Sequence, residues 1–376
     1  MKDREHTGRM TRVEPLAVRR LQDFRQARGH VRRSVGRCVR VALVLAAVCA
    51  GPAWSAPGGL TGKAWSALYY TDDVAIFSAT RRLSLNADPT QPALDDRLMG
   101  QGADGVSEVG LKLSKEWATA AGKTQLDAVG EGFIFLTRTR FTHGTLRLQA
   151  RQAFTEDTAL NLIYYYSPDL YLGENLVRQP IPVLGEAEPD TGPFAPEILT
   201  SHIVSLRLDQ ALTRDLELQV LGRYGLRDYD PQFAQRDLTL WTLGPHLTWT
   251  VMPGLDWTVG YHFERGLADG RSQPWLADDV SYDNNFVSTE LEYEFVENTA
   301  LTVGLHYEIN DWLSRQELDP RYGTAETVWQ GEVLLNHDLS EMTRLFGGVQ
   351  YSRRSINTDA ASINNINVAL GVQLSF

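Results

Sequence analysis

The last twelve residues of the chain, Asn365 to Phe376, read Asn-Ile-Asn-Val-Ala-Leu-Gly-Val-Gln-Leu-Ser-Phe. Large apolar side chains occupy every second position, and small or polar ones occupy the positions between them. Successive side chains of a β-strand point to opposite faces, so this stretch predicts a strand with one apolar and one polar face. Such a strand suits a wall between lipid and water, although it also suits an edge strand of a soluble sandwich.

Strands of about ten residues with this alternation recur along the chain, joined by alternately short and long connections. We count fourteen, and twelve or sixteen are open alternatives. The predicted strands are 62–71, 105–117, 124–137, 144–154, 159–167, 201–211, 215–227, 237–251, 255–266, 284–296, 299–311, 326–339, 342–353 and 364–376. The prediction is an all-β fold, a transmembrane antiparallel up-and-down β-barrel over residues 62–376.

Aromatic residues on the apolar faces gather near the strand ends, as expected where a barrel crosses two lipid interfaces. One rim is predicted to carry Trp117, Phe154, Trp249, Trp257, Phe295 and Phe376. The other rim is predicted to carry Tyr69, Tyr164, Tyr166, Tyr224, Trp241, Phe263, Tyr307, Trp329 and Tyr351. A soluble sandwich gives no reason for this sorting, so the membrane barrel is the favoured interpretation.

The terminal strand resembles the last strand of Gram-negative outer-membrane β-barrels, which alternates in the same way and ends in an aromatic residue. Leu370, Val372, Leu374 and Phe376 carry the resemblance. In that family this strand is the signal for insertion into the outer membrane. The resemblance therefore implies outer-membrane lipid, the barrel-insertion machinery and periplasmic chaperones as partners.

Two further stretches, Tyr69-Tyr-Thr-Asp-Asp-Val74 and Ser281-Tyr-Asp-Asn-Asn-Phe286, look like porin-like barrels and the barrel domains of surface lipoprotein assembly modifiers. Those assembly modifiers carry a helical repeat domain before the barrel. We expect no such domain here, because the first predicted strand begins a few residues after the predicted cleavage site.

The N-terminal region has the composition of a secretory signal. Residues 1–40 carry twelve Lys or Arg against four Asp or Glu, and an apolar run follows at residues 41–50. Small residues at Ala53 and Ser55 favour cleavage near Ser55, so residues 1–55 are predicted to be a signal peptide and 56–61 a short periplasmic tail. The predicted location is the outer membrane of a Gram-negative bacterium.

The composition of the predicted mature chain excludes several functions. Both cysteines, Cys38 and Cys49, lie in the leader, so disulfides, thiolate metal sites and cysteine catalysis are excluded. Removal of the leader leaves 24 basic and 43 acidic residues, a formal net charge of −19. Nucleic acid is therefore not an expected partner.

Residues that alternate with the apolar set are predicted to face the lumen. A predicted acidic wall comprises Asp256, Glu264, Glu290, Glu292, Glu294, Glu308 and Glu332. A predicted basic wall comprises Arg147, Arg151, Arg207, Arg223 and Arg227. Opposed charged walls produce a transverse field that favours hydrophilic passengers, and general diffusion porins are similar in this respect.

These walls predict a passive, weakly cation-selective channel for small hydrophilic solutes. In the alternative, the charges pair across the lumen, and a non-conducting barrel scaffolds or exports a surface lipoprotein or polysaccharide with partners. The long connection 168–200, rich in proline and acidic residues, is expected either to fold inward as a constriction or to remain exposed. The sequence does not set the oligomeric state.

Three histidines, His246, His262 and His306, are predicted to face the lumen at similar heights. Converging imidazoles could bind zinc or act as a proton-sensitive gate, but the strand at 284–296 separates His306 from the other two. We therefore predict neither a metal site nor a cofactor. No catalytic residues are predicted, because lumen-facing Ser288 has no histidine close to it in the pattern.

Overall fold

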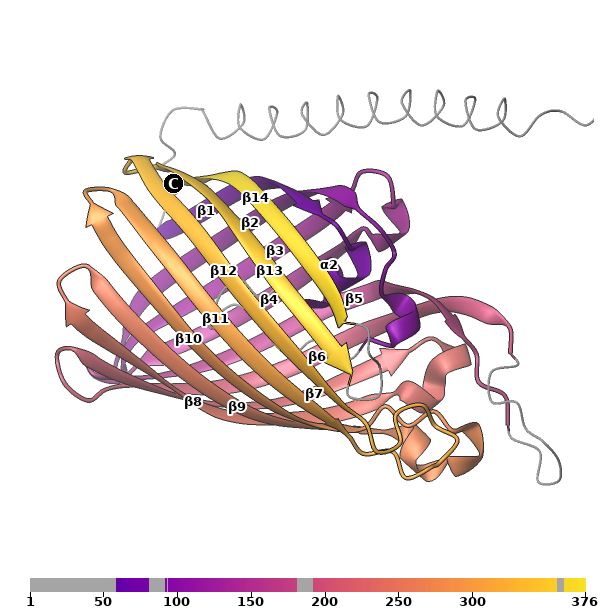
Figure 1. The fold of residues 1–376 in the computed structure, drawn as a ribbon. Helices are drawn as coiled ribbons and strands as arrows, with labels where there is room; N and C mark the ends of the chain where they lie inside the picture. Colours follow the sequence, from indigo (N-terminus) through magenta and orange to yellow (C-terminus); the bar gives the residue numbers. More distant parts are fainter. Residues whose placement is uncertain (1–58, 81–91, 93, 181–191, 357–361) are drawn as a thin grey trace, which may run out of the picture. The chain divides into compact units, whose positions relative to one another are not determined.

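The computed structural model describes residues 59–80, 92, 94–180, 192–356 and 362–376, and it forms a closed antiparallel β-barrel of fourteen strands (Figure 1). The strands are β1 (Leu60–Thr71), β2 (Asp104–Thr119), β3 (Gly122–Phe135), β4 (His143–Ala153), β5 (Thr158–Leu176), β6 (Phe194–Ala211), β7 (Leu216–Tyr229), β8 (Leu238–Met252), β9 (Leu255–Ala268), β10 (Tyr282–Val296), β11 (Thr299–Trp312), β12 (Ala325–Ser340), β13 (Thr343–Ile356) and β14 (Ser362–Ser375). Each strand pairs with its neighbours in sequence, and β14 pairs with β1. The predicted fold class and strand number are confirmed.

The terminal strand closes the barrel. β14 pairs with β1 from Lys63↔Ser375 to Thr71↔Asn367. Beyond that ladder, the Gly62 amide donates to the Phe376 carbonyl at 2.8 Å, and the Phe376 amide donates to the Gly62 carbonyl at 2.9 Å. The phenyl ring covers Gly62, where a Cβ atom would lie 2.4 Å from ring atom Cζ. The last residue therefore seals the seam through its backbone and its side chain.

Two strands are longer than predicted. β5 continues to Leu176 and β6 starts at Phe194, so both ends of the predicted connection 168–200 are a hairpin extension. Positive φ angles are common in turns, and Asp169 and Gly173 have φ angles of 47° and 146°. Here they lie at two register shifts of the β5–β6 ladder, where bulges absorb these conformations without ending the strands. Residues 181–191 of that connection lie outside the described part of the chain.

The outer face of the barrel is apolar, as the alternation predicts. Leu370 is 70% exposed, Trp329 57% and Leu68 56%, while their sequence neighbours point inward. The predicted rim aromatics point outward with one exception. Tyr69 is only 6% exposed and packs inside the barrel, so its predicted place on the lipid face is wrong. Outward-facing Tyr70 occupies the rim position instead, at 52% exposure.

The connections differ in length at the two ends of the barrel. Tight turns such as 120–121, 253–254 and 297–298 mark one end, which we call the short-turn end. The other, long-loop end carries helix α2 (Val74–Thr80) and the 3-10 helices η1 (Asp96–Leu98), η2 (Thr139–Phe141), η3 (Pro231–Arg236), η4 (Asp269–Ser272) and η5 (Pro274–Leu276). In transmembrane barrels, short turns face the periplasm and long loops face outward.

This asymmetry predicts the orientation of the chain in the cell. A peptide tag inserted after Arg271, in η4, should be labelled by antibody on intact cells. A tag in the turn at 253–254 should be labelled only after the cells are permeabilised. Labelling in the reverse pattern would contradict the assigned orientation.

Among the described residues, no helix has both the length and the apolar character needed to cross a membrane. The predicted signal peptide 1–55 lies outside the described residues, and of the predicted tail 56–61, Leu60 and Thr61 already belong to β1.

Candidate functional site

The predicted acidic residues lie on the interior faces of β9 to β12, and most of them accept hydrogen bonds from neighbours in the wall. Glu264 accepts from Thr242 and Tyr282, both at 2.6 Å. Glu308 accepts from the Asn284 amide at 2.7 Å. The remaining predicted acidic positions follow the same alternation: Asp256, Glu290, Glu292, Glu294 and Glu332. Glu292 and Glu294, near the short-turn end, are exposed.

The predicted basic residues lie on the interior faces of β4, β6 and β7. Arg207 binds Asp209 of its own strand, with Nε 2.8 Å from Oδ1, and Asn161 donates to the same carboxylate at 2.7 Å. Arg227 is 1% exposed. Arg147, Arg151 and Arg223 complete the predicted set on these faces.

Ion pairs in the wall join residues of the same or adjacent strands. Lys112 on β2 binds Asp127 on β3 at 3.0 Å, and Arg354 on β13 binds Glu326 on β12 at 2.7 Å. These pairs line the wall and do not bridge the bore. These pairs were not predicted, although the alternation along β2, β3, β12 and β13 already assigns their positions to the interior face.

The three lumen histidines do not converge on one point. The rings of His246 and His262 stack with centroids 4.6 Å apart, and their Nε2 atoms are 2.5 Å apart. Phe286 stacks on His262 at 5.8 Å and on His306 at 5.7 Å, so it separates His306 from the other two. Among the residues that the structure describes, no three His, Cys, Asp or Glu side chains are arranged to hold a metal ion.

Helix α2 constricts the long-loop end from inside. Phe77 packs edge-to-face against Tyr69, Phe133 and Phe135, with centroids 5.4, 6.4 and 5.8 Å apart. These partners lie on the interior faces of β1 and β3, so the helix lies within the barrel. On its other side, Ile76 packs in a cluster that includes Leu172 of β5. The first long connection therefore supplies an inward constriction that was not predicted from the sequence. Of the predicted constriction 168–200, Leu172 packs against this helix, and 181–191 lie outside the described residues.

Asp73 holds the start of α2. Its carboxylate accepts hydrogen bonds from the amides of Ala75, at 3.1 Å, and Gly100, at 2.6 Å. Burial raises the pKa of Asp73, and these backbone donors oppose the rise. The contacts fasten the helix to the chain segment that leads into β2.

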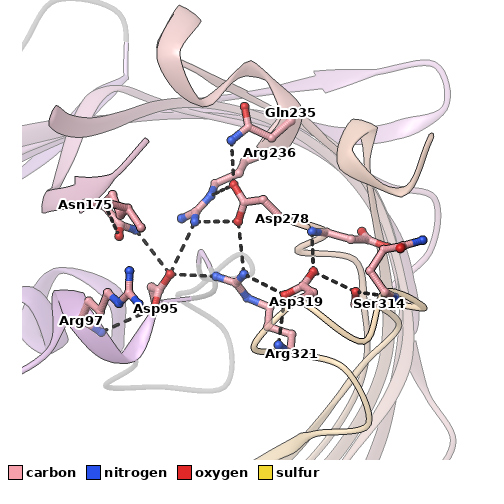
Figure 2. Close-up of polar contacts among 12 residues, drawn as sticks. Asp95, Arg97, Asn175, Gln235, Arg236, Asp278, Ser314, Asp319 and Arg321 are labelled. Carbon is pink, nitrogen blue, oxygen red and sulfur yellow. Dashed lines mark hydrogen bonds and ion pairs between the residues drawn. The ribbon is translucent and has the colours of Figure 1, made fainter. Parts of the chain in front are cut away.

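A buried network of charges, which we call the polar cap, joins the loops of the long-loop end (Figure 2). It comprises Asp95, Glu197, Arg236, Asp278 and Arg321. Arg236 donates to Asp278 through Nε and Nη2, at 2.8 and 2.7 Å, and to Glu197 through Nη1, at 2.9 Å. The Asp95 carboxylate accepts hydrogen bonds from Nη2 of Arg321, at 3.0 Å, and from Nη2 of Arg236, at 3.4 Å.

The polar cap spans the mouth of the barrel. Asp95 precedes β2, whereas Arg236 lies between β7 and β8, six strands away around a ring of fourteen. Arg321 reaches the same carboxylate from the connection between β11 and β12. Loops from nearly opposite sides of the barrel therefore meet at Asp95.

Electrostatics favour the charged state of the cap. Burial alone would raise the pKa of Asp278, but the guanidinium groups of Arg236 and Arg321 outweigh it and hold this pKa below its ordinary value. Burial likewise opposes the charge on Arg236, and the Asp278 and Glu197 carboxylates raise its pKa well above the ordinary value. Asp278 and Arg236, the central pair of the network, are thus both charged at neutral pH.

A closed antiparallel barrel with an apolar outer face and a charged interior defines the class of transmembrane β-barrels. Comparison with protein-family models gave no match, and comparison with curated proteins gave none. Among solved structures, the chain is similar to the outer membrane channel DcaP of Acinetobacter baumannii, with 10% identity, a TM-score of 0.45, and coverage of 85% of this chain and 96% of that one.

It is also similar to an anion-selective porin from Comamonas acidovorans, with 11% identity, coverage of 84% and 98%, and a TM-score of 0.41. A third similar structure is OccK1 (OpdK) of Pseudomonas aeruginosa, with 10% identity, coverage of 84% and 99%, and a TM-score of 0.40. These likenesses concern the fold alone.

Proposed function

We propose that the protein is an outer-membrane channel for small hydrophilic solutes. The observation that carries this proposal is the charged interior wall, in which residues such as Lys112 and Arg207 bind partners in the wall itself. Side chains held in this way leave the axis of the barrel to water. Barrels of sixteen strands leave an aqueous channel and barrels of eight are filled, so fourteen strands favour a bore narrowed by its own loops.

We further propose weak selectivity for cations. Glu290, Glu292 and Glu294 follow one another on the interior face of β10, in the half of the lumen nearer the short-turn end. Exposed carboxylates attract cations within about one Debye length, roughly 10 Å at 0.1 M salt. The preference should therefore weaken as the salt concentration rises.

The constriction by α2 and the polar cap favours a second candidate function. A barrel that is closed at rest would scaffold or export a surface component together with partners, and would conduct only when these elements move. Conductance of the refolded protein in a planar bilayer separates the two functions. Regular steps support the channel, and their absence supports the closed barrel.

The outer-membrane location and the assembly partners are part of the proposal. Two features support them: the basic and apolar leader, and the alternating terminal strand with Phe376 at its end. We propose that the barrel-insertion machinery reads this strand after periplasmic chaperones deliver the chain.

The selectivity has a direct mutational test. Replacement of Glu292 and Glu294 together by Gln should lower the cation preference, measured as the reversal potential under a salt gradient, because both side chains are exposed on the interior face. Stability should change little, since neither position faces lipid.

The matched control changes the opposite wall. Replacement of Arg147 and Arg151 by Gln removes the same number of charges of the other sign, so the cation preference should rise. An anion-selective wild type, or shifts in the same direction for both variants, would contradict the proposed selectivity.

A further inference from the structure

Three interior side chains on neighbouring strands meet above a glycine. Gly304 of β11 pairs with Glu290 of β10 on one side and with Glu332 of β12 on the other. A Cβ atom built on Gly304 would lie 3.0 Å from Oε1 of Glu332 and 3.2 Å from Nε2 of His306. Both side chains therefore lean over the space that the glycine leaves open. Glu290, the cross-strand neighbour of Gly304 on β10, points to the same interior face.

The polar atoms around this space make no hydrogen bonds with the described residues. Oε2 of Glu290, Oε1 of Glu332 and both ring nitrogens of His306 are shielded from solvent and make no hydrogen bond with a described residue. His306 is 4% exposed and Glu332 5%. Nε2 of His306 lies 3.5 Å from Oε1 of Glu332, within ion-pair distance when the imidazole is protonated, but the two atoms form no hydrogen bond. A buried carboxylate oxygen without a donor is unfavourable, so the cluster needs donors and positive charge.

We propose that Glu290, His306 and Glu332 bind a primary ammonium group, such as the end of a small alkylamine. An ammonium group has three N–H donors and one positive charge, which match two carboxylates and one imidazole nitrogen. Hydrogen bonds of about 2.8 Å need a less compact cage than metal–ligand bonds of about 2.0 Å. This inference rests on the proposed channel and names the class of cation that it holds in the lumen.

Binding is measured directly, by titration calorimetry on the tag-free, detergent-refolded barrel with propylammonium chloride. The matched ligand is tetramethylammonium chloride, which has the same charge and no N–H donor. We expect propylammonium to bind at least about tenfold more tightly, because it alone supplies charge-assisted hydrogen bonds. Equal affinities, or no binding of propylammonium, would overturn the proposal.

Two variants test the geometry. Glu332→Gln removes one charge, and Gly304→Ala keeps every charge while its Cβ atom fills the space beside Oε1 of Glu332. Each should weaken propylammonium binding about tenfold or more. The controls are Glu294→Gln, an exposed lumen carboxylate, and Gly222→Ala, whose Cβ atom would meet nothing within 4 Å.

Each variant is first shown to refold by its heat-modifiable mobility. Wild-type affinity in Gly304→Ala, or equal losses in Glu294→Gln and Glu332→Gln, would overturn the site. Since calorimetry requires no current, a barrel that binds propylammonium but does not conduct refutes the channel and leaves the site. A barrel that conducts but does not bind propylammonium refutes the site and leaves the channel.

Discussion

Replacement of Arg236 by Met should open the long-loop end of the barrel. The substitution leaves the carboxylates of Asp278 and Glu197 buried without the guanidinium that binds both. Loss of one partner from a buried ion pair typically destabilises the structure by about 3–5 kcal/mol. The loops should separate, while the strands, which pair through their backbones, keep their β-sheet circular dichroism. We expect a larger single-channel conductance and faster proteolysis in the loops.

The matched control is Arg265→Met. Arg265 also makes a bidentate ion pair, with Asp283. This pair lies on the exposed outer face, near the same end of the barrel. Exposed ion pairs contribute little to stability, so this variant should behave as wild type. If Arg236→Met has wild-type conductance and proteolysis, the polar cap does not hold the loops.

Acid should remove the contribution of Asp278 to the cap only at low pH. The pKa of Asp278 is lower in the folded protein than its ordinary value, so its contribution to stability is fully present above the ordinary value of 3.8. That contribution is lost as the pH falls through the lowered pKa. Loosening of the cap through protonation of Asp278, measured as faster proteolysis of the loops, should therefore begin only below about pH 4.

Replacement of Phe376 by Ser should strongly reduce assembly of the barrel. The variant loses the ring that covers Gly62 at the β1–β14 seam, together with the last apolar residue of the terminal strand. The measurement is the amount of heat-modifiable, membrane-embedded protein in an outer-membrane fraction, which we expect to fall severalfold. Secretion across the inner membrane should be unchanged.

Phe376→Tyr is the conservative control, because it keeps an aromatic ring over Gly62 and should assemble as wild type. Refolding of the Ser variant in detergent separates the two roles of the residue. If the Ser variant refolds in vitro but does not assemble in cells, Phe376 acts through the insertion machinery. Normal assembly of the Ser variant in cells would refute both roles.

The sequence by itself predicted fourteen strands, with twelve or sixteen left open, and it determined their two faces. Apolar and polar side chains alternate along Asn365 to Phe376, so one face of this strand points to lipid and the other to the interior. The same strand closes the barrel by pairing with β1. The alternation also placed residues such as Glu308 and Arg207 on the interior face. It misassigned Tyr69, because an aromatic near a strand end suits the lipid interface as well as an interior aromatic cluster.

Only the tertiary structure decided what fills the long-loop end. Asp95 bonds with Arg236 and Arg321 across 141 and 226 residues of sequence, and such contacts leave no periodic signal in the chain. Helix α2, seven residues long, is too short for a periodic signature, and it lies inside because Phe77 finds aromatic partners on two strands. Strand faces follow from local alternation, whereas the constriction and the polar cap depend on which loops meet once the barrel has closed.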